Sequence, residues 1–213
     1  MNTRIAMYCL ASLVLAHQAA AACTEPGKSR WGTKTNVPLH SSISHATMVP
    51  LTDLMHFMDP VPTVKKFSPA VGRIPPFTNA LGLQEGQIVR TKGWLRLVAT
   101  ESNDCEYHIQ LTRTTSADSC FIVEIARDDA TSIQSTWVRN RAAIVRQWFH
   151  DHVTNGAEPT TDSLATPVYV EVVGQLFFDS AHGPHDARGK KGMHATTRWE
   201  LHPILSIKAA TPP

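Results

Sequence analysis

The sequence lacks a long apolar segment beyond its first residues. The apolar run from Ile5 to Ala16 is shorter than the roughly 20 residues that a transmembrane helix requires, and no second run of this kind follows. Arg4 ahead of the run, and alanines between it and Cys23, form the pattern of a secretory signal peptide over residues 1–22. We therefore expect a periplasmic or secreted bacterial protein without a transmembrane segment.

Cysteine is scarce as well. Cleavage after Ala22 would leave three cysteines, an odd number, in an oxidising compartment, so we expect one disulfide and one free thiol. Cys105 and Cys120 bracket a predicted strand and would lie too far apart to pair, whereas Cys23 paired with either of them would tie the N-terminal region to the main domain. A lipid anchor on Cys23 is the alternative, but Ala20 stands where a lipoprotein signal has a bulky aliphatic residue.

A strong net charge and a nucleophile motif are also missing. The formal net charge is +2, and residues 87–208 hold 13 Lys and Arg against 14 Asp and Glu. This balance argues against avid, sequence-independent binding of nucleic acid, which needs many phosphate contacts. No Gly-x-Ser-x-Gly elbow is present, so nucleophilic catalysis has little support.

Residues 23–86 are rich in proline, serine and threonine, and prolines interrupt each candidate element. We expect an irregular arm that lies across the main domain. Only the stretch 52–58 predicts a short helix, with Thr52 as its N-cap and Pro60 closing it.

Residues 87–208 carry the patterns of five strands and one helix. Apolar and polar residues alternate in the strands, and three strands, a helix and two strands is the element order of the OB-fold. We therefore predict a mainly β, OB-like five-stranded barrel with the helix between strands three and four. The strands are predicted at 87–100, 105–113, 119–126, 168–179 and 198–207, and the helix at 135–153.

The same periodicities assign faces to these elements. In the second strand Tyr107, Ile109 and Leu111 are expected to face the core, and Glu106, His108 and Gln110 to face outward. The helix carries one apolar stripe of Trp137, Ile144 and Trp148 and a second one beside it of Val138, Val145 and Phe149, with Arg146 elsewhere.

Several stretches resemble a group of exported bacterial proteins of unassigned function. They are "GWLRLV", "CEYHIQL", "FIVEI", "GQLFFD", "RGKKGM" and "WELHP", within residues 87–207. That group has an OB-like core that ends in a similar Trp-Glu-aliphatic-His-Pro strand. The resemblance implies architecture and compartment, and it implies no catalytic residue.

The connection between strands four and five is a candidate ligand loop, because OB-folds grip ligands with this loop and the face of strands two and three. Its "RGKKG" stretch offers cations between two glycines, which lets the backbone approach an anion. Cations and a Trp on strand one resemble the phosphate contacts and stacking platforms of single-strand binders, although Glu101, Asp104, Glu106 and Glu124 lie on or near the same sheet. The predicted ligand-binding residues are Arg90, Lys92, Trp94, Arg96, His108, Arg188, Lys190 and Lys191.

The same loop is rich in histidine and suggests a divalent metal site. Imidazole and carboxylate groups suit zinc or another first-row ion, but no helix aligns these histidines as in a His-Glu-x-x-His motif. The predicted ligands are Asp179, His182, His185 and His194, with Asp186 and His202 as further members. Glu200 and His202 lie two apart on a strand and share a face, so they are interpreted as a structural pair, with a general base as the alternative.

These features predict a non-enzymatic exported binding module that contacts an anionic or polymeric ligand, either nucleic acid or an envelope component. One alternative is a metal-dependent hydrolase or nuclease that uses the histidine loop. Another is a structural or assembly protein whose arm docks on an envelope protein.

Overall fold

The computed structural model describes residues 30–38, 43–60, 72–160, 163–183 and 185–213. The predicted signal peptide and Cys23 lie outside these residues. Among the described helices, none combines the length and the apolar character that crossing a membrane would require.

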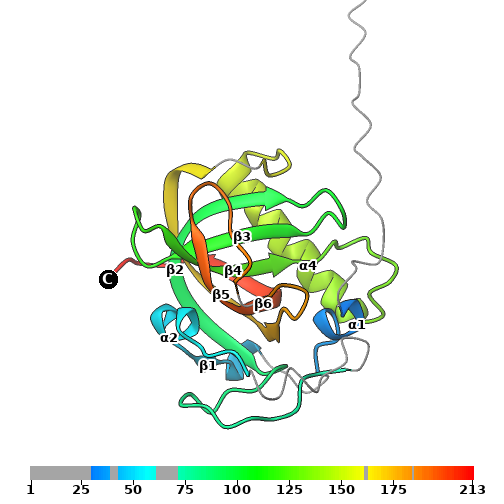
Figure 1. The fold of residues 1–213 in the computed structure, drawn as a ribbon. Helices are drawn as coiled ribbons and strands as arrows, with labels where there is room; N and C mark the ends of the chain where they lie inside the picture. The colour runs from blue at the N-terminus through cyan, green and yellow to red at the C-terminus, as the bar shows by residue number, and fades with distance from the viewer. Residues whose placement is uncertain (1–29, 39–42, 61–71, 161–162, 184) are drawn as a thin grey trace, which may run out of the picture.

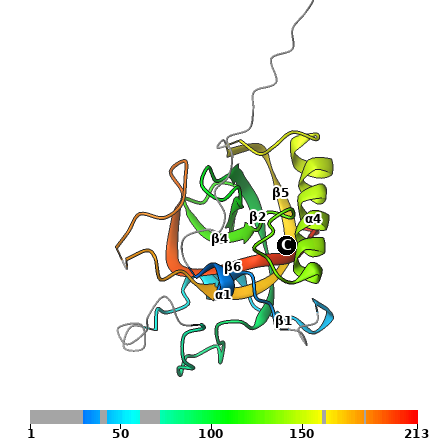
Figure 2. The ribbon, with the colours of Figure 1, turned by 90° about the vertical axis from the view of Figure 1, so that its right-hand side faces the viewer.

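Five strands close into a barrel (Figures 1 and 2). The first three pair as an antiparallel meander, the third pairs in parallel with the last, and the remaining antiparallel pairings close the ring. The ring order β2-β3-β4-β6-β5 and the helix between β4 and β5 are those of an OB-like barrel, which confirms the predicted fold. The strands are β2 (Ile88–Thr100), β3 (Tyr107–Thr112), β4 (Ser119–Ile125), β5 (Ser163–Phe178) and β6 (His194–Ala209).

The strands form where the sequence alternates. In β2 the even positions from Arg90 to Arg96 are partly or fully exposed, while Val89, Leu95 and Leu97 are buried in the barrel. In β5 the register shifts on both sides of Gly174, which marks a bulge in this strand. A Cβ on this glycine would lie 3.0 Å from side-chain atoms of β6, so the close approach of β5 and β6 favours glycine here.

The described parts of the arm pack into the barrel. They form α1 (Trp31–Lys34), a 3-10 turn (Ile43–His45), β1 (Thr47–Met48), which pairs in parallel with β2, and α2 (Leu51–Met55). The predicted short helix is α2, but its N-cap is Pro50 and not Thr52. Leu54, Met55 and Phe57 are buried in the same core cluster as the barrel strands. This part of the arm therefore completes the core.

Tyr107, Ile109 and Leu111 of β3 face the core, as predicted, but the opposite face of this strand is covered and not exposed to solvent. Glu106, His108 and Gln110 are all buried, as are their apolar neighbours. The reason is tertiary: Lys34 of α1 bonds Glu106, and the β5–β6 connection lies against Gln110. Both faces of β3 are thus covered, and a polar cluster lies beneath that cover.

The helix α4 (Thr136–Phe149) is capped by Ser135, whose side chain accepts a hydrogen bond from the Val138 N–H, and it continues as the π-helical turn η2 (His150–Thr154). The apolar stripe of Val138, Val145 and Phe149 is buried on the barrel, whereas Trp137 and Ile144 of the neighbouring stripe are 42% and 54% exposed. Arg146 of the same helix is also buried. Its guanidinium lies 3.8 Å from the ring centroid of Tyr107, which is a favourable cation–π contact.

Of the two cysteines in the described residues, Cys105 is disulfide-bonded and Cys120 is a free, buried thiol. This agrees with the expected one disulfide and one free thiol, while the predicted role of Cys23 falls outside the described residues. Burial raises the pKa of Cys120 to about 12.

Because thiolate is the reactive form, we expect Cys120 of the folded protein to react with Ellman's reagent at pH 8 at least about 100-fold more slowly than in 8 M urea. The measurement is the rate of thionitrobenzoate release. Comparable rates in the two solutions would contradict the burial of this thiol.

Candidate functional site

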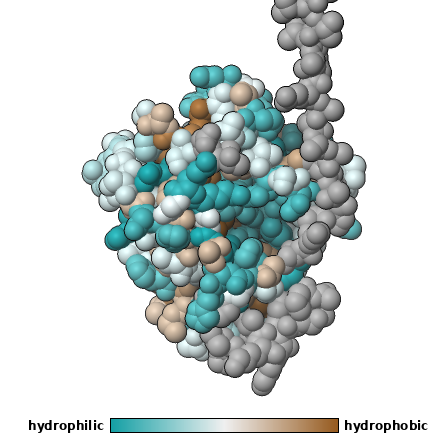
Figure 3. All heavy atoms as spheres, turned by 45° about the horizontal axis from the view of Figure 1, so that its top comes forward, coloured by the Kyte–Doolittle hydropathy of each residue, from teal (hydrophilic) through white to brown (hydrophobic). Residues whose placement is uncertain are grey.

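A cavity of about 420 Å³ lies against the outer face of strands β3, β4 and β6, on the side opposite the barrel core. Its walls are the β2–β3 turn, the β5–β6 connection and polar side chains of β3, β4 and β6. These are the loops and strands with which OB-folds hold ligands. On the molecular face in Figure 3 hydrophilic residues predominate. The lining consists of Lys34, Glu101, Asn103, Asp104, Glu106, His108, Ile122, Glu124, Asp179, Ala181, His182, Ala187, Arg188, Gly189, Lys190 and Glu200.

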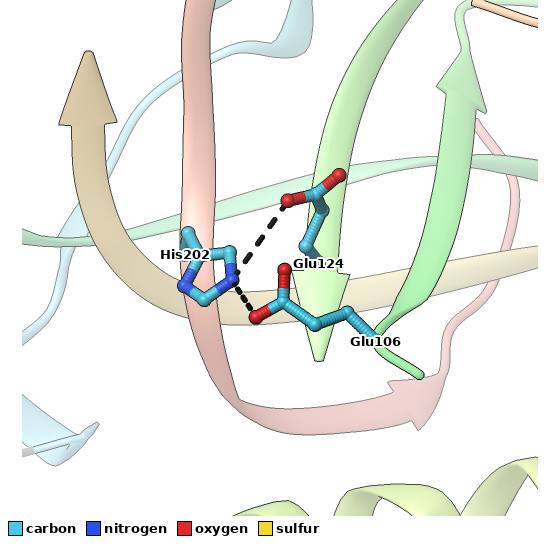
Figure 4. A group of neighbouring side chains, drawn as sticks. All are labelled: Glu106, Glu124 and His202. Carbon is cyan, nitrogen blue, oxygen red and sulfur yellow. Dashed lines mark hydrogen bonds and ion pairs between the residues drawn. The ribbon is translucent and has the colours of Figure 1, made fainter. Parts of the chain in front are cut away.

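A buried charge cluster joins the arm to three strands of the barrel. Lys34 Nζ lies 3.1 Å from Glu106 Oε2 and 3.3 Å from Glu124 Oε2. His202 Nε2 lies 2.6 Å from Glu106 Oε1 and 3.8 Å from Glu124 Oε2. Figure 4 shows the two carboxylates and the imidazole pointing toward one another from the start of β3, from β4 and from β6. Polar side chains of separate elements thus meet at one point.

A second layer of hydrogen bonds fixes this cluster. His108 contacts Glu124 Oε1 through Nδ1 at 3.2 Å, and its Nε2 lies 3.1 Å from Gln110 Oε1. Gln110 then bonds the backbone of Lys190 in both directions, accepting from its N–H and donating to its carbonyl. Gly189, with φ 99°, permits this docking, since a Cβ there would lie 2.3 Å from the Met193 carbonyl oxygen.

Arg188 closes the loop side of the cavity. Its guanidinium lies 2.7 Å from Glu200 Oε2 and 3.3 Å from Asp179 Oδ2, and it donates to the Thr197 carbonyl. His182 Nδ1 bonds the same Asp179 carboxylate. Arg188 is buried, so it acts inside the protein and is not free to bind an external anion.

The surroundings shift the pKa values of the carboxyl groups in the cavity lining. Burial works against ionisation of Glu124, yet Lys34 holds its pKa well below the usual value. Burial, together with Glu124 and Asp179, raises the pKa of Glu200 well above the usual value. Burial and the neighbouring Glu106 raise the pKa of Asp104 to about 6. The surroundings therefore lower the pKa of Glu124 and raise the pKa values of Glu200 and Asp104.

The predicted ligand-binding residues fall in two places. His108, Arg188 and Lys190 line the cavity. Four residues of β2 lie elsewhere: Arg90 and Lys92 pair with Glu171, Trp94 packs edge-on against Tyr169, and Arg96 donates to the Ala117 carbonyl. Lys191, exposed and with φ 53°, lies in the tip of the β5–β6 connection and is absent from the cavity lining.

The predicted metal ligands do not converge. His182 pairs with Asp179, whereas His185 and His194 are exposed. Within the described residues, the group of ligand atoms that all lie within 4.8 Å of one another belongs to Glu106, Glu124 and His202. From the sequence, His202 was predicted only as a further metal ligand, and Glu106 and Glu124 were not predicted as ligands. A signal for them was the alternation of polar residues in the adjacent strands "CEYHIQ" and "IVEI".

Glu200 and His202 share a buried face of β6, as expected, but each binds a different partner. Glu200 pairs with Arg188, and His202 bonds Glu106. Their structural character thus comes from separate ion pairs that anchor β6 to the loop and to β3.

The fold defines the chain as an OB-like barrel protein with a polar cavity on the outer face of β3, β4 and β6. No family model matches the sequence, and no curated protein matches it. A solved structure of a "putative aspartyl-tRNA synthetase" from Leishmania major Friedlin is similar with a TM-score of 0.36 and 9% identity. The match covers 84% of this chain and 23% of that one, so this chain spans about a quarter of its length.

Proposed function

We propose that the protein is a binding module that holds a small, positively charged ligand in the cavity on the outer face of β3, β4 and β6. The observation that carries this proposal is the lining, which has six carboxylates against three cationic side chains. A cleft lined by an excess of one charge concentrates ligands of the opposite charge. The cavity also occupies the position at which OB-folds bind ligands.

The pairing of the loop cations favours a cationic ligand over nucleic acid or another polyanion. Arg188 is held by Glu200 and Asp179, and Lys190 lies 2.9 Å from Glu101. An incoming phosphate would have to compete with these carboxylates. On β2, Arg90 and Lys92 already share Glu171. The stretch "RGKKG" therefore supports the cavity wall in this proposal.

The proposal includes export. The charged start, apolar run and alanines of residues 1–22 support it, and so does the disulfide at Cys105, because disulfides persist in oxidising compartments. A hydrolase that uses Asp179, His182, His185 and His194 gains no support, because these side chains do not converge. Many apolar side chains of the described arm, such as Leu54, Met55 and Phe57, are buried in the core and are not available to a partner, whereas Met48 and Met58 are exposed.

The test is calorimetric titration with hexaamminecobalt(III), an inert trivalent cation, and with a 15-residue oligothymidylate. We expect the cation to bind one site and the oligonucleotide not to bind. Glu101→Gln with Asp104→Asn should weaken binding of the cation about 30-fold, because each of the two lost charges removes on the order of 1 kcal/mol of attraction at short range.

The matched control is Asp118→Asn with Asp151→Asn, which removes the same charge from exposed positions outside the lining. We expect it to change the affinity less than about 2-fold, in line with the screening of distant surface charges. Equal losses in the two double variants, or binding of the oligonucleotide alone, would overturn the proposal.

A further inference from the structure

We propose that Glu106, Glu124 and His202 form a binding site for a divalent first-row transition-metal ion, and that Lys34 is the built-in cation that competes for it. This inference rests on the proposed function, because it names a class of cation and the place in the cavity that takes it.

The three candidate ligands have the arrangement that a metal ion needs. One atom of each lies within 4.8 Å of the other two, and the side chains come from separate elements of a rigid barrel. Glu106 and Glu124 also line the cavity, so water or a ligand could complete the coordination shell from that side. Three protein ligands and an open position are typical of reactive metal sites. Two carboxylates and an imidazole suit manganese, iron, cobalt or zinc.

The neighbouring hydrogen bonds orient these ligands. His202 Nδ1 lies 3.4 Å from the backbone carbonyl of Lys34, so a proton donated there leaves Nε2 directed at the carboxylates. Glu124 uses Oε1 for His108 and has Oε2 directed at Lys34 and His202. In metal sites, hydrogen-bond partners of the ligating side chains fix the orientation of the imidazole ring and its basicity.

The ammonium group of Lys34 already binds the carboxylates of Glu106 and Glu124. Its ammonium lies within 3.3 Å of both carboxylates, and its side chain is 14% exposed and itself lines the cavity. The side chain could therefore swing into the cavity while α1 keeps its place. A metal ion would replace the ammonium and the proton on His202 Nε2, so the two cations exclude each other.

The experiment is titration of Mn²⁺, followed by the loss of the free-ion signal in electron paramagnetic resonance. It uses the wild-type protein, Lys34→Met, and Lys34→Met combined with Glu124→Gln. We expect Lys34→Met to bind one ion at least about 10-fold more tightly than wild type, because the competing ammonium is gone. Adding Glu124→Gln should reverse that gain. Asp151→Asn in the Lys34→Met background is the control, since Asp151 is exposed and lies outside the cavity lining, and it should leave the affinity within about 2-fold.

Lys34→Met leaves two buried carboxylates without their cation, so the variant could unfold. In that case we expect Mn²⁺ to restore its circular dichroism spectrum, because a ligand that binds only the folded state stabilises it. The inference is overturned if wild type and Lys34→Met bind Mn²⁺ equally or not at all, if Glu124→Gln has no effect, or if an unfolded Lys34→Met fails to refold with Mn²⁺. Because hexaamminecobalt(III) cannot coordinate protein ligands, its binding separates a failure of the metal site from a failure of cation binding by the cavity.

Discussion

Replacing Arg188 by methionine should lower the free energy of unfolding by about 3–5 kcal/mol, the usual cost of removing one partner of a buried ion pair. Arg188 and Glu200 are both buried, with their charged atoms 2.7 Å apart. Without the guanidinium, Glu200 loses its ion-pair partner beside Asp179, and the Thr197 carbonyl loses a donor. The measurement is urea denaturation at pH 7.5, followed by circular dichroism.

The double variant Arg188→Met with Glu200→Gln separates the ion pair from simple loss of packing. Because the uncompensated carboxylate is then removed, we expect the double variant to recover at least half of the lost stability. If the changes in the free energy of unfolding caused by the two substitutions are additive, the result would contradict a direct coupling between these side chains.

Replacing Glu85 by alanine should have an effect of similar size, again about 3–5 kcal/mol. The side chains of Glu85 and Arg30 are both 0% exposed, and their charged atoms lie 2.6 Å apart. Glu85 also accepts backbone N–H bonds from Ile74 at 2.6 Å and Phe178 at 3.0 Å. One carboxylate thus connects the start of α1, the last segment of the arm (72–86) and the end of β5, so its loss should loosen all three. Urea denaturation measures this effect too.

Asp129→Ala is the control for Glu85→Ala. Asp129 pairs with Arg127 at 2.6 Å, but its side chain is largely exposed, and surface pairs contribute less than about 1 kcal/mol. Equal losses for the two variants would contradict the anchoring role of Glu85.

The barrel was predictable from sequence because its strands alternate with a period of two and its helix follows a different period. The element order then pointed to an OB-like ring, and even the bulge at Gly174 was marked by its glycine. The buried face of α4 was not predictable, because two apolar stripes lie side by side on the helix. Only contact with the barrel selects the stripe of Val138 and Phe149 over that of Trp137 and Ile144.

Only part of the candidate site could be predicted from the sequence. The β5–β6 connection was located correctly, because the fold places it beside the ligand face. Its cations were interpreted as free, since a sequence does not reveal that Arg188 meets Glu200 inside the protein. Glu106 was expected to face solvent, because the strand period predicts two faces but does not say that the outer one is covered. Lys34 comes from the arm, more than 70 positions before Glu106 in the chain, and no local pattern connects them.

The most direct test of the cation-binding cavity is nuclear magnetic resonance of the ¹⁵N-labelled protein during titration with hexaamminecobalt(III), which is diamagnetic. The account predicts that backbone amide shifts concentrate in residues 101–108 and 179–190 and in Glu124 and Glu200, and that they saturate with one site. Shifts concentrated on the outer face of β2, from Arg90 to Arg96, or uniform shifts that do not saturate, would contradict it.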